Sequence, residues 1–572
     1  MKNKWNIILI IAAVVVVLAG IGVLIFKKFA PSFTQRTMSE QYNELGKEEA
    51  LMIVNGFPIE DKGKVLNDTM YVPLTLATDL MNERLYWDAK EGILSLATVQ
   101  GLIRVNGGEG EGSTTYTLGN ETIEAKNQVL YQDGDVTWIS MDFVEQYSCI
   151  EYEAKKEPNR ILVKTDFDTV RTFAKMADDV RLRVGPNKKY DYLLEIPKDT
   201  EVLIDTAAKP ENEYQKILTT DGIEGYVPVE YLTEQTQKPW KTEKQVEVFP
   251  RLKEDAGTIC LGWHQMMSTV GSAELEAKIA NAKSLNVISP TWFALSDNKG
   301  NFTSIASTEY VTAAHSKGLK VWGLINDFDT KISLKKVLGR TTNRTNLVNN
   351  LVTTAIKYDL DGLNIDFEKI TEETAPAYLQ FLRELTLRCH ANDITVSVDD
   401  YLPTAVSSFY HWSEQGRIVD YVIFMAYDEH YAGSEESGSV SSLPFVKKGV
   451  DLGLEHIPAE RVVVALPFYT RLWKETKVKG KTEVSSSAYG MSSAESVLQA
   501  NGATTKWDDA TNQYYAQFKA DGATYKIWLE EETSLEKKLE VVFDKKVAGV
   551  AFWKLGFERP VTWTTIEKHI KK

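Results

Sequence analysis

Two acidic residues and an amide, Asp366, Glu368 and Asn364, occupy alternate positions in the stretch from Gly362 to Lys369. If this stretch is a β-strand, residues two apart share a face and lie about 6.6 Å apart. Carboxyl groups at that separation cannot both ionise freely, so the pKa of one of them rises. A carboxyl group that stays protonated near neutral pH can act as a general acid. The spacing therefore indicates acid–base chemistry, with a half-exposed surface strand as the alternative.

Helical patterns flank this strand on both sides, over Thr345–Tyr358 and Pro376–Asn392. Strands that alternate with helices form parallel sheets that are covered on both faces. Acidic groups that point to the inside of such a sheet must be paired or functional, because an isolated buried charge is costly. This context favours the functional interpretation of Asp366 and Glu368.

Eight strand-like runs, most of them separated by helical patterns, predict an α/β fold, a TIM (β/α)8 barrel over residues 245–572. The site of such a barrel lies at the C-terminal ends of its strands. A segment at about residues 471–531 separates the seventh strand from its helix, for which Thr533 and Glu536 predict a capping-box start. The eight runs are Thr258–Gly262, Val287–Trp292, Lys320–Ile325, Gly362–Glu368, Ile394–Asp399, Tyr421–Tyr427, Val462–Pro467 and Gly549–Trp553.

The run Asp361-Gly362-x-Asn364-x-Asp366-x-Glu368 resembles the Asp-Gly-x-Asp-x-Asp-x-Glu signature of glycoside hydrolase family 18. Asn364 stands where most chitinases of that family have an aspartate. The sequence Asn-Ile-Asp-Phe-Glu is similar to that of the family's wall-lytic, spore-germination branch. The departure leaves open any proton-relay role of the aspartate that most chitinases have here. The resemblance also implies that the segment 471–531 is a small α+β insertion that walls a substrate groove.

The resemblance extends to other strand ends. The run Met425-Ala426-Tyr427-Asp428 resembles the family's Met-x-Tyr-Asp element, and Trp553 resembles the tryptophan that floors its cleavage subsite. It implies Glu368, Asp366 and Tyr427 as catalytic residues, whereas core packing is the alternative for each aromatic residue alone. The candidate substrate-binding residues are Asp361, Asn364, Met425, Asp428, Trp553, Tyr469, Arg471, Tyr401 and Asn326, with Trp263 and Trp292 as weaker candidates.

The mechanism that the resemblance implies is substrate-assisted retention, an exception to the scheme with two catalytic carboxylates. Glu368 would protonate the leaving oxygen, and the substrate's own 2-acetamido oxygen would attack the anomeric carbon. Asp366 would orient the acetamido group and stabilise the positive oxazolinium ion, with Tyr427 in contact with the same group.

An apolar run from Ile7 to Phe26 lies between Lys2/Lys4 and Lys27/Lys28. Its length of about 20 residues matches a membrane-spanning helix, whereas a cleavable signal peptide has an apolar core of about 7 to 15 residues. We therefore expect residues 1–28 to be an uncleaved transmembrane signal anchor, with a cleaved signal as the alternative, and residues 29–50 to be a linker. The hydrolase resemblance implies a single-pass protein of the cell membrane with its catalytic domain outside.

Two further segments precede the barrel. Residues 51–165 contain a weak internal repeat, strand–helical turn–strand–strand, that begins at Tyr71 and again at Thr137, and they resemble the stalk domain at the N-terminus of copper amine oxidases. Residues 178–233 contain short strands with turn residues and resemble a bacterial Src-homology-3-like barrel, a common wall-binding module. For both segments a spacer without ligand is the alternative.

Composition limits the other classes of function. The 572 residues suggest three or more domains, and the formal net charge of -15 argues against a nucleic-acid-binding protein. The three cysteines are far apart, and neither they nor the seven histidines have metal-ligand spacing, so we expect no metal or other cofactor. We expect a glycosidase that cleaves β-1,4 bonds of N-acetylglucosamine-containing glycan, peptidoglycan or spore cortex, with a chitinase or an inert glycan-binding barrel as alternatives.

Overall fold

The computed structural model describes residues 2–107, 113–252 and 257–570. The intervening and terminal residues belong to the expected anchor, stalk and barrel segments, and those parts of the predictions lie outside the described residues. The chain forms two compact units. The first consists of residues 1–85, 105–116 and 123–246, and the second of residues 86–104, 117–122 and 247–572.

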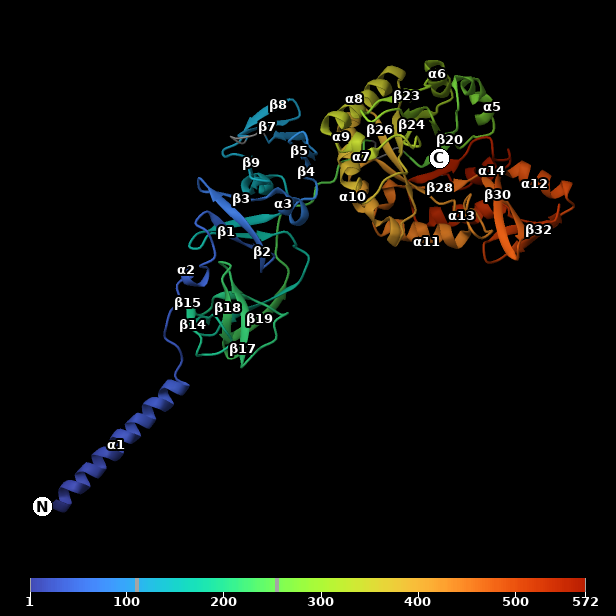
Figure 1. The fold of residues 1–572 in the computed structure, drawn as a ribbon. Helices are drawn as coiled ribbons and strands as arrows, with labels where there is room; N and C mark the ends of the chain where they lie inside the picture. Colours follow the sequence, from blue (N-terminus) through green and yellow to red (C-terminus); the bar gives the residue numbers. More distant parts are fainter. Residues whose placement is uncertain (1, 108–112, 253–256, 571–572) are drawn as a thin grey trace. The chain divides into compact units, whose positions relative to one another are not determined.

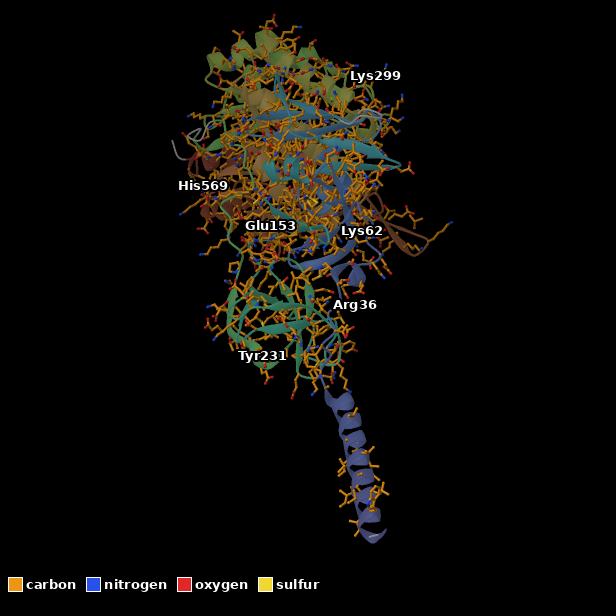
Figure 2. All side chains as sticks on the ribbon, turned by 90° about the vertical axis from the view of Figure 1, so that its left-hand side faces the viewer. Arg36, Lys62, Glu153, Tyr231, Lys299 and His569 are labelled. Carbon is orange, nitrogen blue, oxygen red and sulfur yellow. The ribbon has the colours of Figure 1, made fainter. Side chains whose placement is uncertain are left out.

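The first unit begins with the helix α1 (Lys2–Phe29), whose described apolar side chains from Ile7 to Val23 are exposed to solvent (Figure 2). Among the residues that the structure describes, no helix combines the length and the apolar composition needed to span a membrane. The transmembrane anchor stays a prediction from the sequence. The short helix α2 (Met38–Gln41) follows, and Thr37 and Glu40 form a capping box at its start.

A seven-stranded sheet of the first unit contains the second copy of the expected repeat and the first strand of the first copy. Its strand order is β11-β12-β1-β2-β3-β10-β9. The repeat is confirmed in its element order, since each copy runs strand, short helix, strand, strand, but only the second copy places its last two strands in this sheet. The elements are β1 (Glu49–Val54), β2 (Phe57–Leu66), β3 (Thr69–Pro73), α3 (Leu74–Leu80), β9 (Leu130–Asp133), β10 (Val136–Ser140), α4 (Met141–Gln146), β11 (Glu151–Lys155) and β12 (Arg160–Lys164).

A second seven-stranded sheet, with the order β15-β14-β18-β17-β16-β13-β19, completes the first unit. Its strand pairs are antiparallel, and their inward residues, such as Leu182, Ile217 and Val227, form a small core of their own. Tyr231, labelled in Figure 2, packs against this core. The strands are β13 (Arg171–Met176), β14 (Val180–Arg183), β15 (Tyr192–Ile196), β16 (Glu201–Ile204), β17 (Tyr214–Thr219), β18 (Glu224–Pro228) and β19 (Leu232–Lys238).

The second unit is built on a closed barrel of eight parallel strands, as expected from the sequence. The order is β21-β20-β34-β28-β27-β26-β25-β24, and the pairing of β21 with β24 closes the circle. Barrel strands are covered on both sides and therefore consist of nearly continuous apolar runs. The strands are β20 (Ile259–His264), β21 (Val287–Pro290), β24 (Lys320–Asn326), β25 (Gly362–Asp366), β26 (Thr395–Tyr401), β27 (Tyr421–Met425), β28 (Val462–Pro467) and β34 (Gly549–Trp553).

Helices surround the outside of the barrel strands (Figure 1). Side chains that point inward, such as Trp263, Trp322 and Ile423, fill the barrel, and those that point outward pack against the helices. The helices are α5 (Leu275–Ile279), α6 (Thr308–Ser316), α7 (Leu334–Leu338), α8 (Thr341–Tyr358), α9 (Ala375–His390), α10 (Trp412–Ile418), α11 (Leu443–Leu454), α13 (Glu532–Asp544) and α14 (Thr562–Glu567). The short strands β22 (Phe293–Leu295) and β23 (Phe302–Ser304) extend the sheet beside β24.

The predicted start of α13 was wrong by two residues. The capping box is formed by Glu531 and Ser534, not by Thr533 and Glu536, because the Glu531 carboxylate accepts hydrogen bonds from the backbone N–H groups of Thr533 and Ser534. A glutamate at an N-cap position is less usual than serine or threonine. Thr533, a residue type that is more common at N-caps, lies two positions later, and the prediction chose it in place of Glu531.

An α+β insertion lies between β28 and α13, where the sequence interrupts the barrel pattern. A five-stranded antiparallel sheet with the order β30-β29-β33-β32-β31 packs against one helix. The elements are β29 (Tyr469–Val478), β30 (Lys481–Gly490), α12 (Met491–Ala500), β31 (Thr505–Asp508), β32 (Gln513–Ala520) and β33 (Ala523–Trp528). The insertion thus begins immediately after the end of β28.

A hairpin from the middle of the expected stalk segment belongs to the second unit. Its strands are β4 (Tyr86–Asp88), β5 (Ile93–Thr98) and β6 (Gly101–Asn106), and β7 (Thr115–Leu118) and β8 (Glu121–Glu124) follow along the chain. Asp88 and Glu91 accept hydrogen bonds from the backbone N–H groups of Thr341 (2.7 Å) and Thr342 (2.9 Å). Carboxylates stabilise a helix N-terminus, so the hairpin caps α8, the helix that leads into β25.

Candidate active site

A cavity of about 600 Å³ lies at the C-terminal ends of the barrel strands, where a TIM barrel carries its site. Because Asp366 ends β25 and Met425 ends β27, residues that are distant in the sequence meet there. Nine of the predicted site residues line this cavity: Glu368, Asp366, Tyr427, Met425, Asp428, Trp553, Tyr469, Tyr401 and Asn326. The weaker candidates Trp263 and Trp292 line it as well.

The loop after β25 carries Glu368, and Asp327 fixes that loop. The two oxygens of the Asp327 carboxyl group accept hydrogen bonds from the backbone N–H groups of Glu368 and Lys369, both at 3.1 Å. The Lys369 ammonium group donates to the backbone carbonyl of Asp327 at 2.6 Å. Asp327 follows β24, so two neighbouring strand ends position the proposed acid together.

The pKa of Glu368 is raised, chiefly because burial disfavours its charged form, and the nearby Asp327 and Asp428 add to the effect. A hydrogen bond from the Tyr401 hydroxyl group to the Glu368 carboxylate opposes this shift and lowers the pKa. The same bond contributes to the raised pKa of Tyr401, after burial of that side chain. Glu368 can therefore hold a proton at a pH where an exposed glutamate has lost it.

We expect Tyr401→Phe to raise the pKa of Glu368, because the variant loses a donor to the charged form of the carboxyl group. Activity requires the protonated acid, so the alkaline limb of the pH profile of kcat/KM should move to higher pH by about one unit or less. A pH profile with a soluble chromogenic substrate measures the shift. Tyr431→Phe, which alters a tyrosine outside the cavity lining, is the matched control. An unchanged alkaline limb would show that the hydroxyl group does not tune Glu368.

Asp366 is 7% exposed and faces a second carboxyl group, that of Asp399, which is 2% exposed. The two strands are in register with Ile365 opposite Val398, and Asp366 and Asp399 are the next residue of each. Burial is the main cause that raises the pKa of Asp366, and the neighbouring carboxylates of Asp399 and Glu368 raise it further. The cavity therefore holds three carboxyl groups, from the ends of β25 and β26, that compete for protons.

Asn364 lies inside the barrel beneath this cavity, with every polar atom of its amide group in a hydrogen bond. Its oxygen accepts from the Trp263 indole N–H (2.9 Å) and from the Ser289 hydroxyl group (3.0 Å). Its nitrogen donates to the Ser397 hydroxyl group (3.0 Å) and to the Asp399 carboxyl group (2.7 Å). Asn364 thus links β25 to three other barrel strands, β20, β21 and β26, across the inside of the barrel and holds Asp399 in place.

Aromatic side chains form the other walls of the cavity. The rings of Trp263 and Trp553 meet edge to face with their centroids 5.9 Å apart. The Tyr469 hydroxyl group donates to Asp428, and the Tyr469 ring contacts that of Tyr427 at 6.2 Å between centroids. Burial is the main cause of the raised pKa of Tyr427, so its hydroxyl group stays a neutral hydrogen-bond donor.

Three predicted substrate-binding residues do not line the cavity. Asp361 precedes β25, at the opposite end of the strand, and its carboxylate accepts from the Val321 backbone N–H and bonds to the His315 ring, both at 2.8 Å. Asn364 is fully buried in the network just described. Arg471 lies in β29 and donates to the Ser486 hydroxyl group at 3.1 Å. Substrate contact by these three residues stays a prediction, since none of them lines the cavity.

Several cavity residues were not among the predictions. Asp399 ends a predicted strand, and an inward acidic residue at a strand end was the signal that could have singled it out. Asp327, which does not line the cavity but holds the Glu368 loop, follows a predicted strand in the same way. The remaining lining residues gave no comparable signal, since most are not charged strand ends but lie in loops or in the strands β22, β23 and β24: Gln265, Met266, Met267, Thr291, Phe293, Ala294, Thr303, Ile305, Leu324 and Phe328.

Residues 265–558, just over half of the chain, match the family model of the glycosyl hydrolases family 18. The chain belongs to this family. The match spans seven of the eight barrel strands, all except β20, together with the insertion, and it contains every predicted catalytic residue. Across the described ranges 2–107, 113–252 and 257–570, no three His, Cys, Asp or Glu side chains are grouped so that they could hold a metal ion.

Curated relatives of this family 18 chain include glycosylases of Bacillus subtilis (strain 168). The uncharacterized glycosylase YvbX is 27% identical over 300 residues, which cover 50% of this chain and 85% of YvbX. The cortical fragment-lytic enzyme is 26% identical over 234 residues, which cover 40% of this chain and 54% of that enzyme. The chain thus spans only about half the length of the second relative. Together with the family match, these relatives identify the chain as a glycoside hydrolase.

Solved structures share the fold of the family 18 barrel. The chitinase from Chromobacterium violaceum superposes with a TM-score of 0.50 at 19% identity, over 55% of this chain and 100% of that chain. The spore cortex-lytic enzyme SleL of Bacillus megaterium QM B1551 superposes with a TM-score of 0.50 at 19% identity, over 62% of this chain and 78% of that chain. At these identities the likeness concerns the fold alone.

Proposed function

We propose that this glycoside hydrolase cleaves β-1,4 bonds on the reducing side of N-acetylglucosamine, by a retaining mechanism in which the substrate's acetamido group is the nucleophile. The observation that carries the proposal is the shared cavity of Glu368, Asp366 and Tyr427. One carboxyl group with a raised pKa lies on a loop held by Asp327, and another lies deeper, beside a neutral tyrosine. This arrangement suits an acid and a charge-stabilising group.

In the proposed reaction, Glu368 donates its proton to the glycosidic oxygen, and the C–O bond to the leaving sugar breaks. The acetamido oxygen of the bound sugar forms a bond to the anomeric carbon and becomes part of a positive oxazolinium ion. The Asp366 carboxylate stabilises that charge, and the Tyr427 hydroxyl group donates a hydrogen bond to the acetamido group. Water, deprotonated by Glu368, then opens the ring and restores the acid.

For the substrate we propose peptidoglycan or spore cortex in preference to chitin. Support comes from the relatives, which include cortical fragment-lytic enzymes as well as an endochitinase of Metarhizium robertsii. The cavity wall contributes exposed apolar side chains, Met267 (89% exposed) and Phe328 (51%), which suit the apolar faces of sugar rings.

Mass spectrometry of digests tests the choice of substrate. The full chain is incubated with peptidoglycan, with isolated spore cortex and with chitin oligomers. We expect muropeptides with N-acetylglucosamine at the new reducing end. Products from chitin oligomers alone would favour the chitinase alternative, and products from none of these glycans would overturn the proposed activity.

We further propose that residues 178–233 act as an SH3-like wall-binding module and that residues 51–165 act as a spacer. The antiparallel strands and the separate small core of the first of these segments are compatible with such a module. Co-sedimentation of the full chain with insoluble peptidoglycan, compared with a chain that lacks residues 178–233, tests the binding role. Equal sedimentation of the two chains would show that residues 178–233 act as a spacer and not as a wall-binding module.

Location at the cell membrane, with the barrel outside, is a proposal that rests on the sequence of residues 7–26 and on the exposed apolar side chains of α1. We expect the full-length chain to remain in the membrane fraction after a high-salt wash, and external protease to remove the barrel from intact cells. Recovery of a soluble mature chain that begins near Pro31 would favour a cleaved signal instead.

A further inference from the structure

Position 364 carries an amide, yet the cavity above it still contains two neighbouring carboxyl groups with raised pKa. The second of these comes from another strand. Asp399 on β26 lies next to Asp366 on β25 in the register of the two strands, and both line the cavity. The hydrogen bond of 2.7 Å from the Asn364 amide N–H to Asp399 holds the second carboxyl group in this position.

Two buried carboxyl groups in adjacent positions cannot both be charged. When both are protonated, the pair loses one proton readily, whereas the remaining proton, which the two groups share, is lost only at much higher pH. Such a pair carries one negative charge over a wide pH range. A single carboxyl group in the same place would instead be held neutral by burial. The neighbours determine on which side of the pair the proton rests.

The groups that face the pair favour a resting charge on Asp399. Asp399 accepts the Asn364 N–H, which stabilises its charged form, although Asp400 and Glu368 oppose this. Asp366 faces Glu368 on the loop after its own strand and Asp327 after β24, and both disfavour its charged form. Tyr427 after β27 faces both members of the pair as a neutral group. These contacts favour a proton on Asp366 in the free enzyme.

We propose that Asp366 and Asp399 hold one proton between them, and that Asp399 takes this proton when positive charge develops on the bound sugar. An O–H bond of Asp366 breaks and an O–H bond of Asp399 forms, so one negative charge moves to Asp366, beside the oxazolinium ion, and no proton leaves the cavity. Asp399 acts through Asp366 and is a positioning residue. The inference rests on the proposed function, because it concerns the same reaction.

The hydrogen bonds around Asn364 permit a sharp test, the exchange of the two side chains. In Asn364→Asp/Asp399→Asn, the new carboxylate at 364 can still accept from Trp263 and Ser289, and it can accept from the new amide at 399. The Ser397 hydroxyl group can reverse its role and donate. The exchange thus moves the carboxyl group from β26 to β25 and can keep the four hydrogen bonds at position 364.

Rates are measured as kcat and KM against pH for the full-length wild type, Asp399→Asn and the exchanged double variant. In Asp399→Asn the proton of Asp366 has no acceptor in the pair. The acidic limb of the pH profile of kcat should therefore move to higher pH by about one unit, and kcat at pH values below the shifted limb should fall about tenfold. KM should change little. The double variant should regain most of the lost kcat and return the limb toward its original pH.

Asp393→Asn is the matched control, since Asp393 is exposed, precedes β26 at the end of the strand opposite the cavity and does not line the cavity. It should leave the acidic limb in place, and thermal denaturation checks that every variant is folded. A wild-type profile for Asp399→Asn would overturn the inference, and so would a loss of kcat without a shifted limb and without rescue by the exchange. A wild-type chain without hydrolytic activity would instead overturn the proposed function itself.

Discussion

Replacement of Glu368 by glutamine is expected to lower kcat by about 10²–10⁴-fold, the usual contribution of general acid–base catalysis. Glutamine preserves the size of the side chain and can still accept the hydrogen bond from Tyr401. It can neither donate a proton to the leaving oxygen nor accept one from the attacking water. KM should stay within a few-fold of the wild-type value, because the contacts that bind the sugar rings remain.

Steady-state rates of Glu368→Gln on the substrate that the wild type cleaves best provide the measurement. Glu372→Gln is the matched control, since Glu372 is exposed on the loop beyond the cavity. A reduction of less than tenfold in Glu368→Gln, with the control at the wild-type rate, would show that another group is the acid. Asp327 and Asp428 would then be the next carboxyl groups to replace, because both lie near Glu368.

A glycan without acetyl groups should resist cleavage, because the proposed nucleophile belongs to the substrate. A well-placed intramolecular nucleophile can correspond to an effective molarity of about 10⁵–10⁸ M, so its loss should slow cleavage at least about 10³-fold. Asp366→Asn should also lower kcat, since it removes the charge that stabilises the oxazolinium ion. A retaining reaction moreover releases the β anomer first.

Proton NMR of fresh digests identifies the first anomer, and mass spectrometry compares N-acetylated with de-N-acetylated oligomers of equal length. Binding of both oligomers to Glu368→Gln, measured by calorimetry, controls for a simple loss of affinity. An α anomer as the first product would contradict the mechanism even though the fold and the family stand. Equal cleavage of the two oligomers would assign the nucleophile to the protein.

The sequence predicted those parts of the site that depend on local pattern. Alternation of apolar and polar residues placed Asp366 and Glu368 at the end of a barrel strand, and eight similar runs predicted the closed barrel. The sequence could not predict which side chains meet across two strands, because the register between β25 and β26 is set by packing and not by the order of residues. Asp399 and the buried network of Asn364 therefore emerged only from the structure.

Domain boundaries were harder to predict for a related reason. The two copies of the repeat in residues 51–165 have the same local element order, but β4 and β5 of the first copy pack with the barrel unit. Local sequence fixes the strands and turns, whereas the choice of packing partner depends on surfaces that meet only in the folded chain. Ala97, which is fully buried in the core of the barrel unit, gives no sign of this in its sequence neighbourhood.

Because the hairpin of β4 to β6 belongs to the barrel unit, that unit is built from separate parts of the chain. Residues 247–572 alone are therefore not the whole unit. A gene fragment that begins after residue 245 would encode all eight barrel strands but would lack the carboxylates of Asp88 and Glu91 that cap α8. It would also lack Arg104, which bonds to the buried Glu384 at 3.2 Å. A break in the chain near residue 245 would therefore separate the barrel strands from these contacts, so we expect an active fragment to include the segment of β4 to β6 as well.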